Sequence, residues 1–424
     1  MYTNHPYATS FRGFGHPELT FAVERTMDML AEKLAIDPFE IRMRNAIQPG
    51  HTTPTQVQLN AGNVGDLPAC LQKAHQLLKL DEGTRIKQSN GKILTKGISA
   101  FWKTSSTPPT ATAGVILTFN TDGSVNLNCS AVELGQGTKT ALGQILSEKL
   151  KLEMNKIHVT MEVNTIYDPF QWKTVASSTT YLAGRAVMIA ADDVIKQLKE
   201  IGAVALQSPV DDLDVAGGRV FVKDEPNHFV HVKDLATGYK YPSGHTIGQL
   251  IIGEGSKVVR HLTPLDPETG FGKSGPQWSV GVQGIVAEYN PKLCTYEVID
   301  AVTVLDGGTI IHRQNAIGQM RGGMYLGLSW ASRESFAFSE TGLVENPNFR
   351  SYDVLRASEA PNYKVAFVET PAGDGPYGAR GIGEYGVIGM AGALGNSLAR
   401  ASGAELNQLP LTPEMIWKSK GGPN

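Results

Sequence analysis

Four short segments of the chain are rich in glycine, and these segments constrain the fold more than any other feature. The sequence holds 46 glycines in 424 residues, with clusters at 11–15, 135–137, 318–323 and 378–386. Each cluster borders a predicted helix, where free backbone N–H groups and the helix dipole favour anionic ligands. One such turn more often serves only to reverse the chain. Four together predict a cradle for a large anionic cofactor.

Apolar spacing predicts helices and strands that follow one another without regular β-α-β alternation. The first helix follows Pro17 and carries apolar residues at helical spacing from Leu19 to Leu30. A second begins at Asp37, with Glu40 placed for a capping box. Further helices are predicted at 67–80, 138–151, 181–201, 316–332 and 386–404, hairpins at 115–129 and 279–305, a strand at 156–163 and short strands within 203–275. This order predicts an α+β fold of mixed sheets with packed helices.

Composition excludes several classes of protein. The net charge of −3 favours neither nucleic acid nor an anionic membrane as a partner. The three cysteines, Cys70, Cys129 and Cys294, are far apart, so they predict neither an iron–sulfur cluster nor a disulfide framework. The first residues lack a secretory signal, and no apolar run is long enough for a membrane helix. We therefore expect a cytoplasmic protein.

The last glycine cluster allows more than one interpretation. Residues 381–386 match the G-x-G-x-x-G pattern of dinucleotide-binding folds. That interpretation requires a β-α-β unit with an acidic residue about twenty positions later. Glu405 lies near that offset, but no convincing strand surrounds it. Glu384, inside the cluster, is either a first-turn residue stabilised by the helix dipole or a general base on a rigid backbone. The residues alone leave both possibilities open.

Five motifs, in order along nearly the whole chain, resemble one family. They are residues 11–18 (FRGFGHPE), 133–137 (ELGQG), 176–179 (ASST) followed by 184–187 (GRAV), 306–308 (DGG) with 318–319 (GQ), and 378–384 (GARGIGE). In this order they resemble the C-terminal part of the molybdopterin-binding subunit of the xanthine dehydrogenase/aldehyde oxidase family. The resemblance implies the fold of that subunit, in agreement with the α+β expectation.

The resemblance implies a molybdenum hydroxylase. Molybdenum is then held by the dithiolene of molybdopterin, with a cytosine dinucleotide form as one option, and by no protein ligand. Glu384 is the implied catalytic base, which removes a proton from the hydroxide on molybdenum. The implied reaction hydroxylates an electron-poor carbon of an aromatic N-heterocycle (purine or nicotinate-like) or an aldehyde, using water. Electrons then pass to iron–sulfur clusters and FAD on partner subunits.

The resemblance also assigns residues to the cofactor and to the small-molecule substrate. The implied cofactor-binding residues are Gly135, Gln136, Gly137, Val175, Ala176, Ser177, Ser178, Gln319 and Gly383. On the substrate side it implies Phe14, Arg12 and Phe101, for which core packing (Phe14) and a surface ion pair (Arg12) are the alternatives. The family's second stacking phenylalanine aligns with Ala100, one residue before Phe101. The substrate therefore stays open.

Other parts of such an enzyme have no counterpart in this sequence. Iron–sulfur motifs, a flavin-binding segment and the first half of the molybdopterin-binding subunit are missing. We expect residues 1–66 to complete the first molybdopterin-binding domain of a partner chain, and residues 67–424 to form the second. The expected partners are an N-terminal molybdopterin subunit, an iron–sulfur subunit and a flavin subunit. The alternative is a non-catalytic scaffold or assembly protein that retains the fold; Glu384, Gln136 and Gln319 together argue against it.

Overall fold

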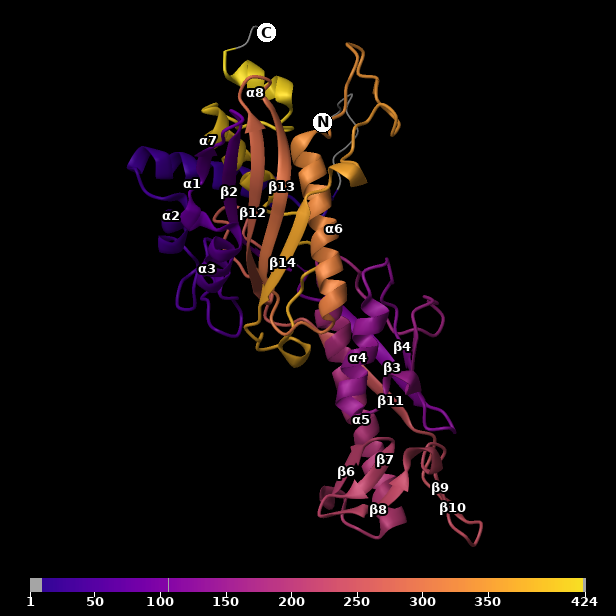
Figure 1. Cartoon of the computed structure of the whole chain (residues 1–424). Helices are drawn as coiled ribbons and strands as arrows, with labels where there is room; N and C mark the ends of the chain where they lie inside the picture. The colour runs from indigo at the N-terminus through magenta and orange to yellow at the C-terminus, as the bar shows by residue number, and fades with distance from the viewer. Residues whose placement is uncertain (1–9, 106, 422–424) are drawn as a thin grey trace.

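The computed structural model describes residues 10–105 and 107–421, which form two bodies stacked end to end (Figure 1). The upper body is built on a five-stranded sheet in the order β1-β2-β12-β13-β14, and the lower body on a four-stranded sheet in the order β11-β3-β4-β5. A three-stranded sheet, β6-β7-β8, and the β9–β10 hairpin lie at the far end of the lower body. Strands and helices mix in both bodies, so the α+β prediction is confirmed.

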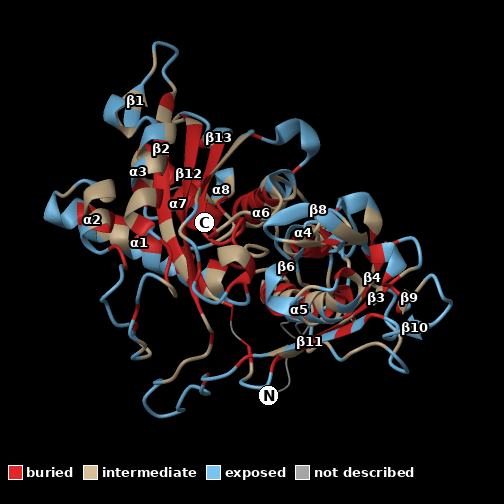
Figure 2. Ribbon diagram, turned by 90° about the horizontal axis from the view of Figure 1, so that it is seen from below, coloured by how far each residue is buried: buried red, intermediate tan, exposed pale blue. Residues whose placement is uncertain are grey.

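The upper sheet is covered on both faces by helices. Its strands are β1 (Arg85–Lys87), β2 (Ile93–Thr104), β12 (Trp278–Asn290), β13 (Thr295–Asp306) and β14 (Asn362–Val368). Its helices are α1 (His16–Leu34), α2 (Pro38–Arg44), α3 (Leu67–Leu78), α6 (Arg313–Ser332), α7 (Met390–Ser402) and α8 (Pro413–Ser419). The central strand β12 pairs antiparallel with β2 and β13, and β14 runs parallel to β13. Because α3 packs on one face and α7 on the other, β12 is buried along nearly its whole length (Figure 2).

The lower body is organised around one long helix. Its main elements are β3 (Thr112–Phe119), β4 (Val125–Asn128), α4 (Thr138–Leu150), β5 (Ile157–Thr160), α5 (Thr179–Leu206) and β11 (Ile252–Val258). The small strands are β6 (Leu213–Ala216), β7 (Arg219–Val222), β8 (Glu225–His231), β9 (Tyr239–Lys240) and β10 (Thr246–Ile247). Glycines of β11 let α5 approach closely: a Cβ on Gly255 would lie 2.2 Å from the Ala186 oxygen.

Most predicted elements are present, with corrections at two glycine clusters. Residues 318–323 lie inside α6 and form no turn; Gly323 instead allows α6 to approach the backbone at Gly386, where an added Cβ would lie 2.6 Å from the Gly386 Cα. The last small-residue helix begins at Met390, so Glu384 stands in the preceding turns and not at a helix start. Strands β1, β2 and β14 and helix α8 were not predicted. At α2, Asp37 caps the helix, but Glu40 pairs with Arg44 and closes no capping box.

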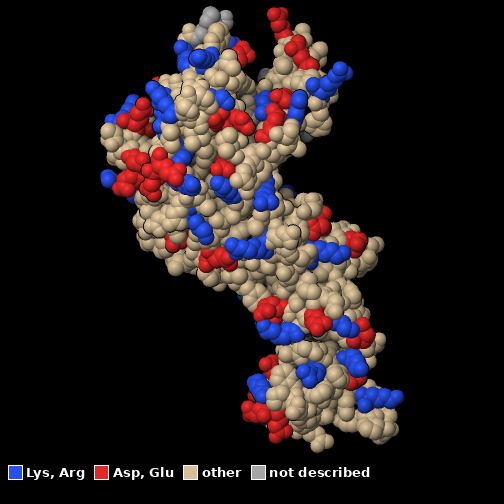
Figure 3. Space-filling view, viewed as in Figure 1, with Lys and Arg blue, Asp and Glu red and all other residues tan. Residues whose placement is uncertain are grey.

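Surface properties agree with the composition. Lys and Arg side chains are interspersed with Asp and Glu over the face in Figure 3. None of the helices in the described part of the chain combines the length and apolar character needed to cross a lipid bilayer. Helices α1 and α2 pack on the same body as β2 and α7, and the division at residue 66 stays a prediction.

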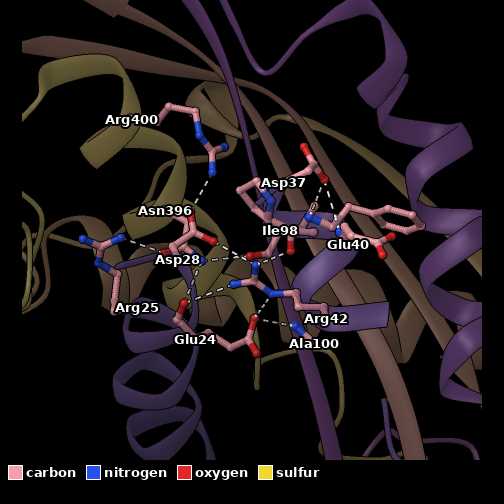
Figure 4. A network of polar contacts seen from close by, with 12 residues as sticks. Glu24, Arg25, Asp28, Asp37, Glu40, Arg42, Ile98, Ala100, Asn396 and Arg400 are labelled. Atoms are coloured by element: carbon pink, nitrogen blue, oxygen red, sulfur yellow. Dashed lines mark hydrogen bonds and ion pairs between the residues drawn. The ribbon is translucent and has the colours of Figure 1, made fainter. Parts of the chain in front are cut away.

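Helix α1 is attached to the upper body by charged side chains (Figure 4). Arg42 of α2 pairs with Glu24 at 2.6 Å and with Asp28 at 2.8 Å, and all three side chains are less than a tenth exposed. Arg400 of α7 pairs with Asp28 at 2.7 Å, and Glu24 also accepts the N–H of Ala100 in β2. Four elements therefore meet in one buried ionic network.

A methyl group at Gly97 is expected to separate β2 from α7. An added Cβ would lie 2.2 Å from the Ala393 oxygen and 2.5 Å from the Ser397 nitrogen. Gly97→Ala should lower the free energy of unfolding by about 1–3 kcal/mol, as overpacked cores do, measured by urea denaturation. Gly318→Ala is the control, because a Cβ there meets open space on a helix; equal effects of the two variants would contradict the prediction.

Candidate active site at the junction of the two bodies

One pocket of about 600 Å³ lies where loops of the two bodies meet. The lower body contributes residues 134–138, 174–177 and 179–180, and the upper body contributes 10–12, 379–384 and several residues between 307 and 319. Helices α4, α5 and α6 all begin in or beside this lining. Ten of the predicted site residues line the pocket together: Arg12, Gly135, Gln136, Gly137, Val175, Ala176, Ser177, Gln319, Gly383 and Glu384.

Glu384 is held by three donors from three distant segments. Its Oε2 accepts hydrogen bonds from Lys103 Nζ and Ser177 Oγ, each at 2.9 Å, and its Oε1 accepts the Gly13 N–H at 3.1 Å. Burial raises the pKa of Glu384, but the charge of Lys103 and these hydrogen bonds outweigh it, so the pKa lies below its usual value. The carboxyl group is therefore ionised at neutral pH.

Lys103 is the main site residue that sequence reasoning missed. It belongs to β2 and lies on the face of that strand that carries Phe101, with its side chain only 3% exposed. A lysine on the inward face of a strand is rare unless it is paired, which is a usable signal. The signal could not be used because β2 itself was not predicted.

The segment that carries Glu384 is held to the central strand β12. The buried amide of Gln283 donates to the Gly386 oxygen and accepts from the Gly389 N–H, both at 2.6 Å. Ser279 Oγ donates to the Gly381 oxygen at 3.0 Å. Both side chains are fully or almost fully buried, so few alternative partners are available. The position of the carboxylate is thus set by contacts with the buried central strand β12.

Arg12 holds two pocket segments together, and it forms no surface ion pair with the residues that the structure describes. Its Nε donates to the Gly383 oxygen at 2.7 Å, and its Nη2 donates to Gln319 Oε1 at 3.1 Å. These bonds connect the first loop to α6 and to the backbone beside Glu384. The guanidinium is therefore occupied by hydrogen bonds to other protein groups. This arrangement does not support the predicted contact between Arg12 and the substrate.

Two loops give the pocket its open backbone surface. Ala176 and Ser177 have φ values of 55° and 57°, a left-handed conformation that costs about 1–3 kcal/mol at such residues and is frequent at binding sites. In the other loop, Glu133 accepts the N–H groups of Gly135 and Gly137, at 2.9 Å each. The Gln136 amide donates to Val132 and Thr138 of the same loop. The loop is thereby pre-shaped by its own contacts.

Three predicted residues lie outside the pocket lining. Phe101 is 3% exposed and packs against Tyr385, with ring centroids 6.3 Å apart, so its inward position in β2 excludes direct substrate stacking in this structure. Ser178 is buried, and its Oγ donates to the Val175 oxygen at 2.7 Å. Phe14 is 69% exposed and left-handed, with φ 54°, so it is not a core residue of the first helix.

Comparison with known proteins identifies the class of fold. Quinoline 2-oxidoreductase from Pseudomonas putida 86 superimposes with a TM-score of 0.83 at 21% identity, over 98% of this chain and 53% of that chain. Aldehyde oxidoreductase from Desulfovibrio gigas gives a TM-score of 0.81 at 22% identity, over 99% of this chain and 42% of that chain. This chain therefore has the fold of about half of each of these two oxidoreductase chains.

Sequence comparison identifies the family. The chain matches molybdopterin cofactor-binding domains over residues 1–46 and 73–361. It is 31% identical to a putative xanthine dehydrogenase molybdenum-binding subunit of Escherichia coli K12, over 98% of this chain and 54% of that protein. It is 27% identical to the nicotine 6-hydroxylase large subunit of Paenarthrobacter nicotinovorans, over 97% and 51%. The chain therefore belongs to the molybdopterin cofactor-binding domain family, as its motifs predicted, and spans about half the length of these relatives.

Proposed function

We propose that this chain is the catalytic half of the molybdopterin-binding subunit of a molybdenum hydroxylase. The observation that carries the proposal is the ionised, three-donor Glu384 facing a pocket bordered by three helix N-termini. A carboxylate that is ionised at neutral pH is available to accept a proton. A scaffold protein would not require a buried carboxylate whose charge is maintained by a buried lysine.

The pocket fits an extended anionic cofactor. Residues 175–177 offer exposed backbone beside the start of α5, and Gln319 of α6 and the loop 135–137 form the other walls. We assign these residues to molybdopterin, because helix N-termini bind anions. When bound, the cofactor supplies a redox-active molybdenum that activates water and accepts the substrate's electrons. Glu384 takes the proton at its carboxylate, Ser177 and Gly13 orient it, and Lys103 keeps it ionised.

The proposed substrate is an electron-poor aromatic N-heterocycle, purine or nicotinate-like, or an aldehyde. The names of relatives refer to xanthine, nicotine, quinoline and aldehydes. Phe14, exposed beside the Glu384 loop, is available to contact a planar molecule. Phe101 is buried and does not line the pocket, so we do not propose it as a second stacking residue.

The proposed enzyme is a complex of several polypeptides. Relatives are named as a large subunit and a large chain, and this chain spans about half their length. We propose partners that supply the remaining half of the molybdopterin subunit, the iron–sulfur clusters and FAD. A cytoplasmic location is supported by three buried free cysteines, which suit a reducing compartment.

Purification of the tagged chain from its native host tests the proposal. We expect molybdenum and pterin in the purified complex, with turnover of at least one compound from a panel of purines, nicotinate, quinoline and aldehydes, measured with an artificial electron acceptor. A stable complex without molybdenum would contradict the proposal. A loaded complex without turnover on any of these compounds would favour the scaffold alternative.

Lys103→Met is expected to shift the acidic limb of the kcat/KM profile to higher pH. Because the base acts when ionised, activity is present above the folded pKa of Glu384 and is lost as pH falls through it. The substitution removes the largest of the effects that lower this pKa, while burial remains and Arg12 and His16 still face the carboxylate. Lys103→Arg keeps the charge and should keep the limb in place. An unchanged limb in Lys103→Met would contradict the assigned role.

A further inference from the structure

Helix α1 begins at a glycine, which cannot cap the helix with a side chain. The residue at its N-cap is Gly15. The start of a helix is usually fixed by a serine, threonine, aspartate or asparagine that accepts a hydrogen bond from the first turn. His16, the first residue of α1, instead folds its side chain back onto the preceding loop. The side chain at this helix start therefore acts on the loop that leads to it.

The loop before α1 has a backbone conformation that needs support. Gly13, Phe14 and Gly15 have φ values of 111°, 54° and 82°, so three consecutive residues have positive φ. A bulky residue such as phenylalanine rarely adopts this conformation. The Phe14 side chain is 69% exposed, so burial of its ring does not stabilise the loop. Hydrogen bonds within the loop therefore have to hold its shape.

Two of these hydrogen bonds meet at the Gly13 carbonyl. Its oxygen accepts the backbone N–H of His16 at 3.2 Å and the ring Nδ1–H of His16 at 3.0 Å. A carbonyl oxygen can only accept, so the ring proton in this contact lies on Nδ1. Both the neutral and the protonated ring can carry that proton. The contact therefore persists when the ring changes its charge.

The same glycine donates to the carboxylate in the pocket. The Gly13 N–H lies 3.1 Å from Glu384 Oε1, so one residue links the ring of His16 to Glu384. Burial and the charge of Lys103 lower the pKa of His16, so the ring is neutral at neutral pH. The charges that face Glu384 are then those of Lys103 in β2 and Arg12 in the loop. The contribution of the ring is the position that it gives to Gly13.

We propose that His16 is a positioning residue for Glu384: its Nδ1–H holds the Gly13 carbonyl, and this contact directs the Gly13 N–H at the carboxylate. The inference rests on the proposed function for the role of Glu384 as a base, whereas the contact itself is a property of this chain. Glycine has a wide range of backbone conformations, so Gly13 turns away when the ring no longer holds it. Glu384 then keeps only the donors Lys103 and Ser177.

The first test follows the pKa of Glu384 in the full chain. His16→Asn keeps a side-chain N–H close to the position of Nδ1, His16→Leu has the same branched shape without a donor, and His16→Ala is a second variant without one. The chain is labelled with ¹³C at its glutamate carboxyl carbons, and the Glu384 signal is identified by NMR through its absence in Glu384→Gln. Since a lost donor no longer stabilises the ionised form, Glu384 should titrate at higher pH in His16→Leu and His16→Ala than in His16→Asn. None of the three replacements carries a charge, so the difference among them isolates the hydrogen bond.

The second test measures turnover by the complex purified from the native host. His16→Leu is expected to lower kcat by about 10–100-fold, as a small misplacement of a catalytic group does. His16→Asn should recover most of this loss. His228→Leu, at an exposed histidine of β8, is the matched control and should keep the kcat of wild type.

Two results would overturn the role of His16. The first is an equal titration of Glu384 in the Leu, Ala and Asn variants, and the second is an equal kcat of the Leu and Asn variants in an active complex. All variants should melt within a few degrees of wild type, because His16 is only partly buried. A wild-type complex without turnover, in a chain whose Glu384 titrates as expected, would defeat the proposed function and leave the positioning contact standing.

Discussion

Glu384→Gln is expected to abolish turnover while leaving the molybdenum content of the complex intact. Glutamine keeps the size of the side chain, and its amide oxygen can still accept hydrogen bonds. It cannot take a proton, and loss of a general base lowers rates by about 10²–10⁴-fold. The measurement is kcat/KM with the best substrate of the panel, together with metal analysis of the same preparation.

A control separates chemistry from folding in this experiment. Glu414→Gln changes an exposed carboxylate in α8, far from the pocket, and should leave kcat/KM within twofold of wild type by the small effect of surface substitutions. Glu384→Gln leaves Lys103 buried without its counter-charge, so some loss of thermal stability is expected. Residual activity above about a tenth of wild type would remove Glu384 from the role of base.

Arg42→Met is expected to lower the free energy of unfolding by about 3–5 kcal/mol. The Arg42 side chain is 1% exposed, and Glu24 and Asp28 are 5% and 9% exposed. Removing one partner of a buried ion pair leaves uncompensated charge in a medium of low polarity, which costs far more than the pair itself contributes. Two carboxylates share this arginine, so the effect falls at the upper end of single substitutions.

Arg44→Met is the matched control for that experiment. Arg44 lies two residues later in α2 and pairs with Glu40 at 2.7 Å, with side chains 62% and 46% exposed. An exposed pair of this kind contributes about 0.3–0.5 kcal/mol. Urea denaturation of both variants gives the comparison. A loss below about 1 kcal/mol for Arg42→Met would show that the network relaxes around the missing charge.

Local patterns predicted elements whose signal is complete within a short stretch of sequence. The β12–β13 hairpin, helix α5 and the Asp37 cap of α2 are examples, because alternation, helical spacing and capping are local properties. Strand β2 has no such complete local signal. It is buried on both faces, yet Lys96, Ser99 and Lys103 interrupt its apolar run. The partner of Lys103 is Glu384, which lies 281 residues away in the sequence. The sequence around a strand does not predict partners that lie far away in the chain.

The glycines of α6 show the opposite error. Gly322 and Gly323 suggest a turn by composition, but Gly323 faces Gly386, and the missing side chains allow two backbones to meet. A glycine can form a turn or allow two backbones to pack closely. Which of the two applies depends on the segment that packs against it, and a single sequence does not show that segment.

The site was predictable as a set of segments and less so as individual contacts. The motifs predicted one site that contains Arg12, Ser177, Gln319 and Glu384. In the structure these residues line one pocket. The orientation of single side chains was not fixed by the motifs: Ser178 points back to its own loop, and Phe101 points into the core. The supporting role of Gln283 depends on β12 passing beneath the 386–389 turn.

Helix α5 makes the pocket sensitive to changes far from its walls. The Ala176–Ser177 wall is joined directly to the first turn of α5, and the orientation of that helix is set by the glycines of β11, where Gly253 and Gly255 meet Val194 and Ala186. A bulkier residue at either glycine is expected to displace the 28-residue helix α5 from the sheet. Such a shift would move the first turn of α5 and with it Ser177, which donates a hydrogen bond to the Glu384 carboxylate. A substitution in β11 can therefore reduce catalysis although it contacts neither cofactor nor substrate.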